Sequence, residues 1–139
     1  MTISLKYISH ELKSGRIYRP LIPLTFYGRE NRDVIGILDS GSDISIIPKE
    51  IVEFLEIELF DNNEVFGISG TSIKVKEGKM RITFGKGREF YNFEIPILVP
   101  DSDDVPLIIG RKGFFDQFKI TFIESEKKIL FKKYPKEKP

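Results

Sequence analysis

The most constraining feature of this chain is an apolar run that ends in a carboxylate. Residues Val34 to Leu38 form a nearly unbroken apolar segment, typical of a strand buried on both faces, and Asp39 follows it directly. An ionisable group at the end of a core strand is costly unless hydrogen bonds or chemistry compensate for it. Ser40 and Gly41 fit a tight turn, because glycine accepts backbone conformations that other residues resist. The tripeptide alone is compatible with an ordinary Asx turn and with a functional carboxylate.

Length and composition describe a single globular domain. The chain has 139 residues, of which 40% are apolar and 31% are charged, values typical of a soluble protein. No apolar run approaches the roughly 20 residues needed to span a bilayer, and the N-terminus lacks the apolar core of a signal peptide. The formal net charge of +1 gives no general electrostatic argument for nucleic acid. We therefore expect a cytoplasmic protein that binds neither membranes nor nucleic acid.

The residue types present exclude several chemistries. The chain has no cysteine, which excludes disulfides and thiol catalysis, and its single histidine, His10, leaves too few ligands for a zinc site. Serine-histidine-aspartate catalysis would depend on His10, which lies in a polar N-terminal segment, so we do not favour it. The acidic segment Asp101–Asp104 is expected to be a solvated turn rather than a cation site. We therefore predict neither a metal nor a cofactor.

Most of the chain alternates in the manner of half-exposed strands. Met80, Ile82 and Phe84 alternate with polar neighbours, and this period of two indicates antiparallel strands. Two short helices are expected, one from residue 48 to about 55 with proline at its first position, and one over 110–118. Many short strands and few helices predict a β-rich barrel or sandwich.

The same pattern divides the chain into three parts. Residues 18–132 are predicted to form the folded domain, and residues 133–139, rich in lysine and proline, a disordered tail. The N-terminal segment, residues 1–17, is mixed in character, with a polar turn or loop expected from His10 to Arg16.

Four motifs, taken in order, resemble the retropepsin-like aspartic proteases, the single-domain relatives of pepsin. The apolar strand ending in Asp-Ser-Gly at 39–41 is similar to that family's Asp-Thr/Ser-Gly. A glycine-bearing hairpin at 66–71 lies about where such proteins place a flap. The apolar-apolar-Gly-Arg stretch at 107–111 leads into a segment, 114–122, that looks like the helix and strand of cellular and bacterial members. The resemblance covers roughly residues 18–132.

The resemblance implies an all-β, closed, barrel-like acid-protease (retropepsin) fold with one or two short helices, and an aspartic endopeptidase without a cofactor. In such enzymes two carboxylates share one proton, so that the ionised one takes a proton from water and the protonated one polarises the scissile carbonyl. This chain carries a single Asp-Ser-Gly, at Asp39. A homodimer that pairs Asp39 of both chains across a two-fold axis is therefore implied. The expected substrate is an extended peptide or an unfolded protein.

The resemblance also assigns roles around the predicted catalytic residue, Asp39. Ser40 would hydrogen bond across the dimer axis and hold the two loops together. Gly41 would let the backbone approach the carboxylates and would bind substrate main chain through its carbonyl. Ser42 stands where many family members carry alanine, and its hydroxyl is expected to hydrogen bond the carboxylates, which would favour activity at acidic pH.

Two further assignments concern the dimer and the substrate. Asp43 and Arg111 occupy positions similar to an aspartate and an arginine that pair in viral members, so an ion pair bracing the dimer interface is expected; two unrelated surface charges are the alternative. The expected flap, which would close over the peptide by strand-like hydrogen bonding, consists of Gly67, Ile68, Ser69, Gly70 and Thr71. A plain hairpin is the alternative for that segment.

Two other functions stay open at this point. The first is a catalytically weak or inactive dimeric peptide-binding module of the same fold. Asp39→Asn would leave ligand binding and dimerisation of such a module largely intact, whereas it would abolish proteolysis by a peptidase. The second is a β-barrel nucleic-acid binder. Its support is a basic stretch from Lys74 to Arg88, whose alternation with apolar residues instead indicates a solvated strand face.

Overall fold

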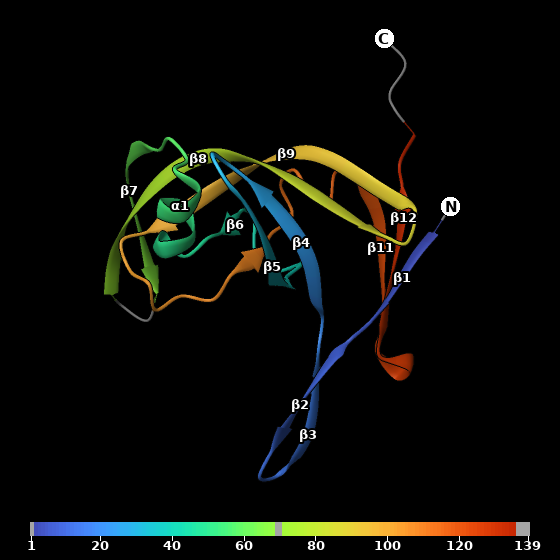
Figure 1. The fold of residues 1–139 in the computed structure, drawn as a ribbon. Coiled ribbons are helices and arrows are strands. Elements are labelled where there is room, and N and C mark those ends of the chain that lie inside the picture. Colours follow the sequence, from blue (N-terminus) through green and yellow to red (C-terminus); the bar gives the residue numbers. More distant parts are fainter. Residues whose placement is uncertain (1, 69–70, 136–139) are drawn as a thin grey trace.

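The computed structural model describes residues 2–68 and 71–135, and for residues 61–68 and 71–73 it describes the backbone alone. Most of these residues lie in strands (Figure 1). In chain order the elements are β1 (Thr2–Lys6), β2 (Ile8–Leu12), β3 (Gly15–Arg19), β4 (Leu21–Tyr27), β5 (Asn31–Leu38), β6 (Ser45–Ile46), α1 (Lys49–Leu55), β7 (Phe60–Ile68), β8 (Thr71–Lys86), β9 (Glu89–Pro100), β10 (Ile108–Ile109), β11 (Phe118–Ile123), the 3₁₀ helix η1 (Glu124–Glu126) and β12 (Lys128–Lys133).

Six strands close into a barrel. Their order is β4-β5-β10-β6-β9-β8, and pairing between β4 and β8 completes the ring. β7 lies outside the ring and pairs with the first half of β8, so β4 and β7 share one edge of that long strand. Closure protects the six strands from edge-to-edge association, because their backbone groups are paired within the chain. The predicted all-β, closed, barrel-like fold is confirmed for the single chain, and the homodimer stays a prediction.

The longest hairpin, β8–β9, supplies one wall of the core. Its register runs from Val75 opposite Pro100 to Lys86 opposite Glu89 without a shift. The alternation seen in the sequence points Met80, Ile82 and Phe84 inward, and all three are buried. The expected period of two is therefore confirmed in β8, with the intervening charged residues on the outside.

A cluster of phenylalanines joins the barrel to a second sheet, ordered β1-β12-β11. Phe84 of the barrel lies with its ring centroid 5.2 Å from Phe114, 5.4 Å from Phe118 and 4.7 Å from Phe131. These edge-on and tilted contacts are the arrangements that aromatic quadrupoles favour. All four rings are buried, so β11 and β12 are held against the barrel by apolar packing.

The N-terminal residues are more ordered than the sequence indicated. β1 pairs in antiparallel register with β12, and residues 8–19 form the two-stranded hairpin β2–β3, which extends away from the barrel (Figure 1). The polar loop expected from His10 to Arg16 is wrong, because His10 lies in β2 and the turn is confined to Lys13 and Ser14. Gly15, with φ of +137°, closes that turn in a conformation that favours glycine.

One of the two expected helices forms. Helix α1 begins at Lys49, one residue later than predicted, with Pro48 at its N-cap, whereas 110–118 contains hydrogen-bonded turns and no helix. Gly113 has φ of +88°, which breaks the helical path, and its amide donates to the Asp116 carboxylate at 2.9 Å. No helix within the described residues is long and apolar enough to cross a membrane. Of the expected disordered tail, residues 136–139 lie outside the described residues, and Lys133 is the last residue of β12.

The acidic segment after β9 is an anchor for α1. Pro48, at the N-cap, has no side chain that could cap the helix, and the Asp103 carboxylate accepts a hydrogen bond from the Glu50 amide at 3.0 Å. Lys49 Nζ donates to Asp101 Oδ1 at 3.2 Å. That hydrogen bond, with the charge of Asp101, raises the pKa of Lys49. The carboxylates therefore supply, from 50 residues away in sequence, the negative charge that a helix N-terminus favours.

Candidate active site

Asp39 lies where a central barrel strand ends. β10 runs parallel to β5 and pairs Ile109 with Leu38, both of which are buried. The next amide along, that of Asp39, donates to the Ile109 carbonyl at 3.0 Å. The paired ends of β5 and β10 thus fix the backbone of Asp39, which is half-buried. A strand does deliver the carboxylate into a turn, but the expectation of burial on both faces is wrong, because Ile35 of β5 is 58% exposed.

The turn after Asp39 holds one oxygen of the carboxylate. The Gly41 amide donates to Asp39 Oδ1 at 2.8 Å, and the Ser42 amide donates to the Asp39 carbonyl at 3.2 Å. This is an Asx turn, in which the side chain mimics a backbone acceptor. A Cβ on Gly41 would lie 3.2 Å from Asp39 Oδ1, so glycine at this position lets the carboxylate lie close to the backbone of the turn. Ser40 and Gly41 are both exposed, and they present this edge of the turn to solvent.

The Asp39 loop is held by hydrogen bonds from residues 110–112, which follow β10 almost 70 residues later in the chain. We call these contacts the latch. The Arg111 and Lys112 amides each donate at 2.9 Å, to the carbonyls of Ser42 and Asp43 respectively. A Cβ on Gly110 would lie 2.6 Å from the carbonyl carbon and oxygen of Ile44, so only glycine fits between the two segments. The latch holds the Asp39 loop in one conformation by backbone contacts.

Sequence reasoning missed Ser45, which completes the latch. Its side chain is fully buried, and its Oγ accepts a hydrogen bond from the Gly110 amide at 3.0 Å. A buried amide without a partner would be costly, so the hydroxyl replaces water at this point. The available signal was a serine inside the apolar run 44–47, where a polar group requires a buried partner.

Asp43 and Arg111 lie side by side on the outer surface of the latch. Arg111 Nη2 donates to Asp43 Oδ1, and the two side chains are 53% and 84% exposed for Arg111 and Asp43. An exposed pair contributes roughly 0–1 kcal/mol to the stability of one chain. The contact lies within one chain, where its contribution to stability is small, and its expected role at a dimer interface stays a prediction.

The expected role of the Ser42 hydroxyl is wrong. Ser42 Oγ donates to the Ile44 carbonyl at 2.8 Å, so its proton is directed along its own loop and away from Asp39. A serine hydroxyl commonly bonds a backbone carbonyl two residues on, and here that local partner wins. Ser42 Oγ therefore stabilises its own loop, and this hydroxyl gives no reason to expect activity at acidic pH.

The described residues of the expected flap lie in the paired ends of β7 and β8, and their role as a flap stays a prediction. Gly67 and Ile68 lie at the end of β7 and Thr71 lies at the start of β8, and the register pairs Gly67 with Ser72 and Ile68 with Thr71. Ser69 and Gly70, the remaining members of the expected flap, lie outside the described residues. In Figure 1 this end of β7 and the carboxyl end of β5 both face the lower part of the view.

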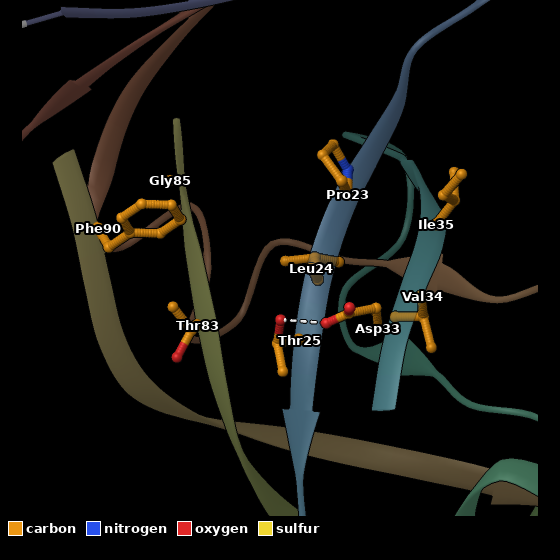
Figure 2. Close-up of a pocket in the computed structure, with 9 residues that line it drawn as sticks. All are labelled: Pro23, Leu24, Thr25, Asp33, Val34, Ile35, Thr83, Gly85 and Phe90. Atoms are coloured by element: carbon orange, nitrogen blue, oxygen red, sulfur yellow. Dashed lines mark hydrogen bonds between the residues drawn. The ribbon is translucent and has the colours of Figure 1, made fainter. Parts of the chain in front are cut away.

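A groove of about 650 Å³ lies elsewhere, on the outer face of the barrel. Figure 2 shows its wall residues on β4, β5, β8 and β9, with Thr25 donating to Asp33 at 2.7 Å. Ile35 and Phe90 line it, and each is 58% exposed. No residue of the Asp39 loop lines the groove, so this hollow is separate from the candidate active site.

Comparison with known proteins identifies the fold. No protein-family model and no curated protein matches the chain. Among solved structures, it is similar to a retropepsin-like aspartic protease from Rickettsia conorii, with 15% identity, coverage of 94% of this chain and 92% of that one, and a TM-score of 0.59. It is also similar to the EIAV protease complexed with the inhibitor HBY-793, with 18% identity, coverage of 75% and 88%, and a TM-score of 0.49. The Rickettsia likeness extends over nearly the whole chain and shows the fold.

Proposed function

We propose that this chain, which has the fold of a retropepsin-like aspartic protease, is an aspartic endopeptidase whose active site forms from two copies. The observation that carries the proposal is the position of Asp39. Its carboxylate stands half-buried at the end of a core strand, with one oxygen held by the Gly41 amide and its loop latched by residues 110–112. A rigidly held carboxylate at an exposed edge is what acid–base catalysis needs from each half of a dyad.

One copy supplies half of the chemistry. The sequence has a single Asp-Ser-Gly, and peptide hydrolysis by this route requires a second carboxyl within hydrogen-bond reach of the same water. A two-fold axis beside Asp39 brings in Asp39 of the partner subunit. Two carboxylates a few ångströms apart cannot both ionise cheaply, so the pair keeps one proton.

The reaction then follows from that shared proton. The ionised carboxylate takes a proton from the bound water as the water oxygen attacks the scissile carbonyl carbon. The protonated carboxyl donates to the carbonyl oxygen and stabilises the charge that develops there. Collapse of the tetrahedral intermediate breaks the C–N bond, and the leaving amine takes a proton from a carboxyl. The pair ends the cycle with the one proton with which it began.

The surrounding residues serve the dimer and the substrate. Ser40 and Gly41, exposed beside the carboxylate, would meet the equivalent loop at the axis. Asp43 and Arg111 would brace the interface from behind, where their pair becomes less exposed and therefore stronger. The β7–β8 hairpin, including residues 67–71, would close over an extended peptide by strand-like hydrogen bonding.

Proteolysis of an unstructured protein tests the proposal. We expect the wild-type chain to cleave casein at some pH between about 3 and 7 and to lose activity as pH rises through the upper apparent pKa of the pair, above which the shared proton is lost. Asp39→Asn should abolish cleavage while leaving the fold and the dimer intact, because asparagine has nearly the same shape. A peptide mimic with a hydroxyl at the scissile position should inhibit the wild-type protein. A dimer that binds this mimic and cleaves nothing at any pH would instead identify a peptide-binding module.

A further inference from the structure

The β2–β3 hairpin, residues 8–19, is the least packed element of the described chain, and we call it the arm. It forms a separate two-stranded sheet and extends beyond the barrel (Figure 1). Every residue of β3 is exposed, and so is the distal half of β2. A lone two-stranded ribbon is at best marginally stable in water, so an arm of this kind requires another surface to hold it.

One face of the arm is polar and finds its partners within the chain. The register pairs Ser9 with Tyr18 and Glu11 with Arg16, and paired residues share a face. Arg16 donates to the Glu11 carboxylate at 2.5 Å and to Ser9 Oγ at 3.4 Å. Lys127, in the turn before β12, lies 5.8 Å from the centre of the Tyr18 ring. This face is therefore turned toward the protein's own second sheet near the base of the arm.

The other face carries the aliphatic side chains of the arm, two of which are exposed in the described part of the chain. It carries Ile8, Leu12 and Ile17, together with His10 and Arg19, by the same alternation. Leu12 is 51% exposed and Ile17 is 40% exposed. We call the three aliphatic residues, Ile8, Leu12 and Ile17, the apolar face of the arm.

The base of the arm lies beside the candidate active site. Leu38, the residue before Asp39, donates from its amide to the Pro20 carbonyl at 2.9 Å, and Leu21 pairs with Ile37. β5 runs toward Asp39 and β4 runs away from it, so the chain that precedes β4 continues past the Asp39 edge of the barrel. Five-residue strands extend about 17 Å in that direction. In the proposed dimer this is the side on which the second copy lies.

We propose that the apolar face of the arm packs against a second copy of this chain, so that the two copies exchange arms across the dimer axis. The inference rests on the proposed function, because the position of the axis comes from pairing Asp39 with its equivalent. The contact is reciprocal, and each arm covers the same surface on the other copy. It enlarges an interface that would otherwise consist of the two Asp39 loops and their surroundings.

A double variant on the arm tests the proposal. Leu12→Ser with Ile17→Ser removes two exposed aliphatic side chains, and both positions can accept serine without disturbing the core. We expect the dimer dissociation constant from sedimentation equilibrium to rise at least about tenfold, since the two lost side chains contribute their apolar contacts to the dimer alone. Ile35→Ser with Phe90→Ser is the matched control. It removes two exposed apolar side chains from the outer groove and should leave the dissociation constant unchanged.

The outcomes separate this inference from the proposed function. A wild-type protein that dimerises and cleaves casein, with an arm variant of unchanged dissociation constant, overturns the arm contact and leaves the peptidase in place. An arm variant that dimerises normally but has a raised KM for peptide assigns the arm to the substrate instead, and also overturns the contact. A wild-type chain that is monomeric and inactive at all concentrations overturns both.

Cross-linking gives a second, independent readout. The chain has no cysteine, so Leu12→Cys introduces a single thiol for a maleimide-linked photo-cross-linker. We expect covalent dimers whose cross-linked peptides come from two different chains, shown by mixing isotopically light and heavy protein. Ile35→Cys, treated in the same way, should give at most background. Cross-links from Leu12→Cys that stay within one chain would contradict the arm exchange.

Discussion

At the scale of single residues, the candidate site depends on two small residues that have no catalytic role, Ser45 and Gly110. Ser45 supplies the acceptor for the Gly110 amide, and Gly110 leaves room for the backbone of Ile44. Between them they allow a loop and a distant segment to lie in backbone contact. Changes at either position should therefore act on stability and on the Asp39 loop together.

Ser45→Ala should destabilise the protein by about 1–3 kcal/mol, because a buried amide loses its hydrogen-bond partner and water cannot replace it. Urea unfolding measures the loss. Ser14→Ala, at an exposed position in the arm's turn, is the matched serine-to-alanine control and should change the free energy of unfolding by less than about 0.5 kcal/mol. Equal effects of the two substitutions would show that the Ser45 contact does not matter for stability.

Gly110→Ala should be more damaging, since its Cβ would lie 2.6 Å from main-chain atoms that have no flexible end to move. We expect a destabilisation of about 1–3 kcal/mol or more, the range for overpacking. Casein cleavage should fall further than the loss of folded protein explains, because the latch on the Asp39 loop has to open. An alanine variant with full activity per folded molecule would contradict the latch.

At the scale of elements, helix α1 is held by the acidic segment that precedes β10. Asp103→Ala removes the acceptor of the Glu50 amide and should cost about 0.5–2 kcal/mol of stability, the usual cost of losing an N-cap. Asp104→Ala is the control. It removes a neighbouring carboxylate but keeps the hydrogen bond that the Asp104 backbone amide donates to Ser102 Oγ. Thermal unfolding of both variants should show the larger loss in Asp103→Ala.

Lys49 reports on the same anchor through its titration. Asp101 raises the pKa of Lys49, so the interaction is fully present below the lysine's ordinary pKa and is lost as pH rises through the raised value. Asp101→Asn should lower the Lys49 pKa toward its ordinary value, as measured by NMR of the lysine side chain. Asp104→Asn should leave that titration as in the wild type. A Lys49 pKa that Asp101→Asn does not lower would exclude the hydrogen bond in solution.

The sequence predicted the elements whose local pattern agrees with their final environment. Alternation marked β8, because a strand buried on one face leaves a period of two in the chain, and the apolar run before Asp39 marked β5. The second helix failed at Gly113, where a positive φ stops a segment that has helical composition. The arm was missed because nearly all its side chains are exposed and therefore carry little burial pattern.

The hydrogen bonds that hold the site and helix α1 could not be predicted from the sequence, for a different reason. Asp103 finds Glu50, and Ser45 finds Gly110, across separations of more than 50 residues. The alternation of apolar and polar residues along the chain does not indicate which distant residue will be the hydrogen-bond partner. Ser42 shows the reverse error, since a role suggested by resemblance gave way to a carbonyl two residues away.

At the scale of the whole molecule, the proposal makes activity a property of two chains. An excess of Asp39→Asn should therefore suppress the wild-type protein, because mixed dimers have one carboxyl and one amide. With free exchange and a tenfold excess, about one in eleven wild-type chains would retain a wild-type partner, and casein cleavage should fall accordingly. An inert folded protein at equal mass is the control. Activity that is unaffected by the mutant chain would show that one copy suffices.

The latch between the Asp39 loop and residues 110–112 also dictates when the site can exist. The two segments follow β5 and β10, whose pairing joins parts of the ring that lie about 70 residues apart in the chain. Contacts between residues so far apart form late and slowly in folding. A chain whose residues 110–112 have not yet met the Asp39 loop lacks the backbone hydrogen bonds that hold this loop. The proposed half-site would therefore form only once the barrel is closed.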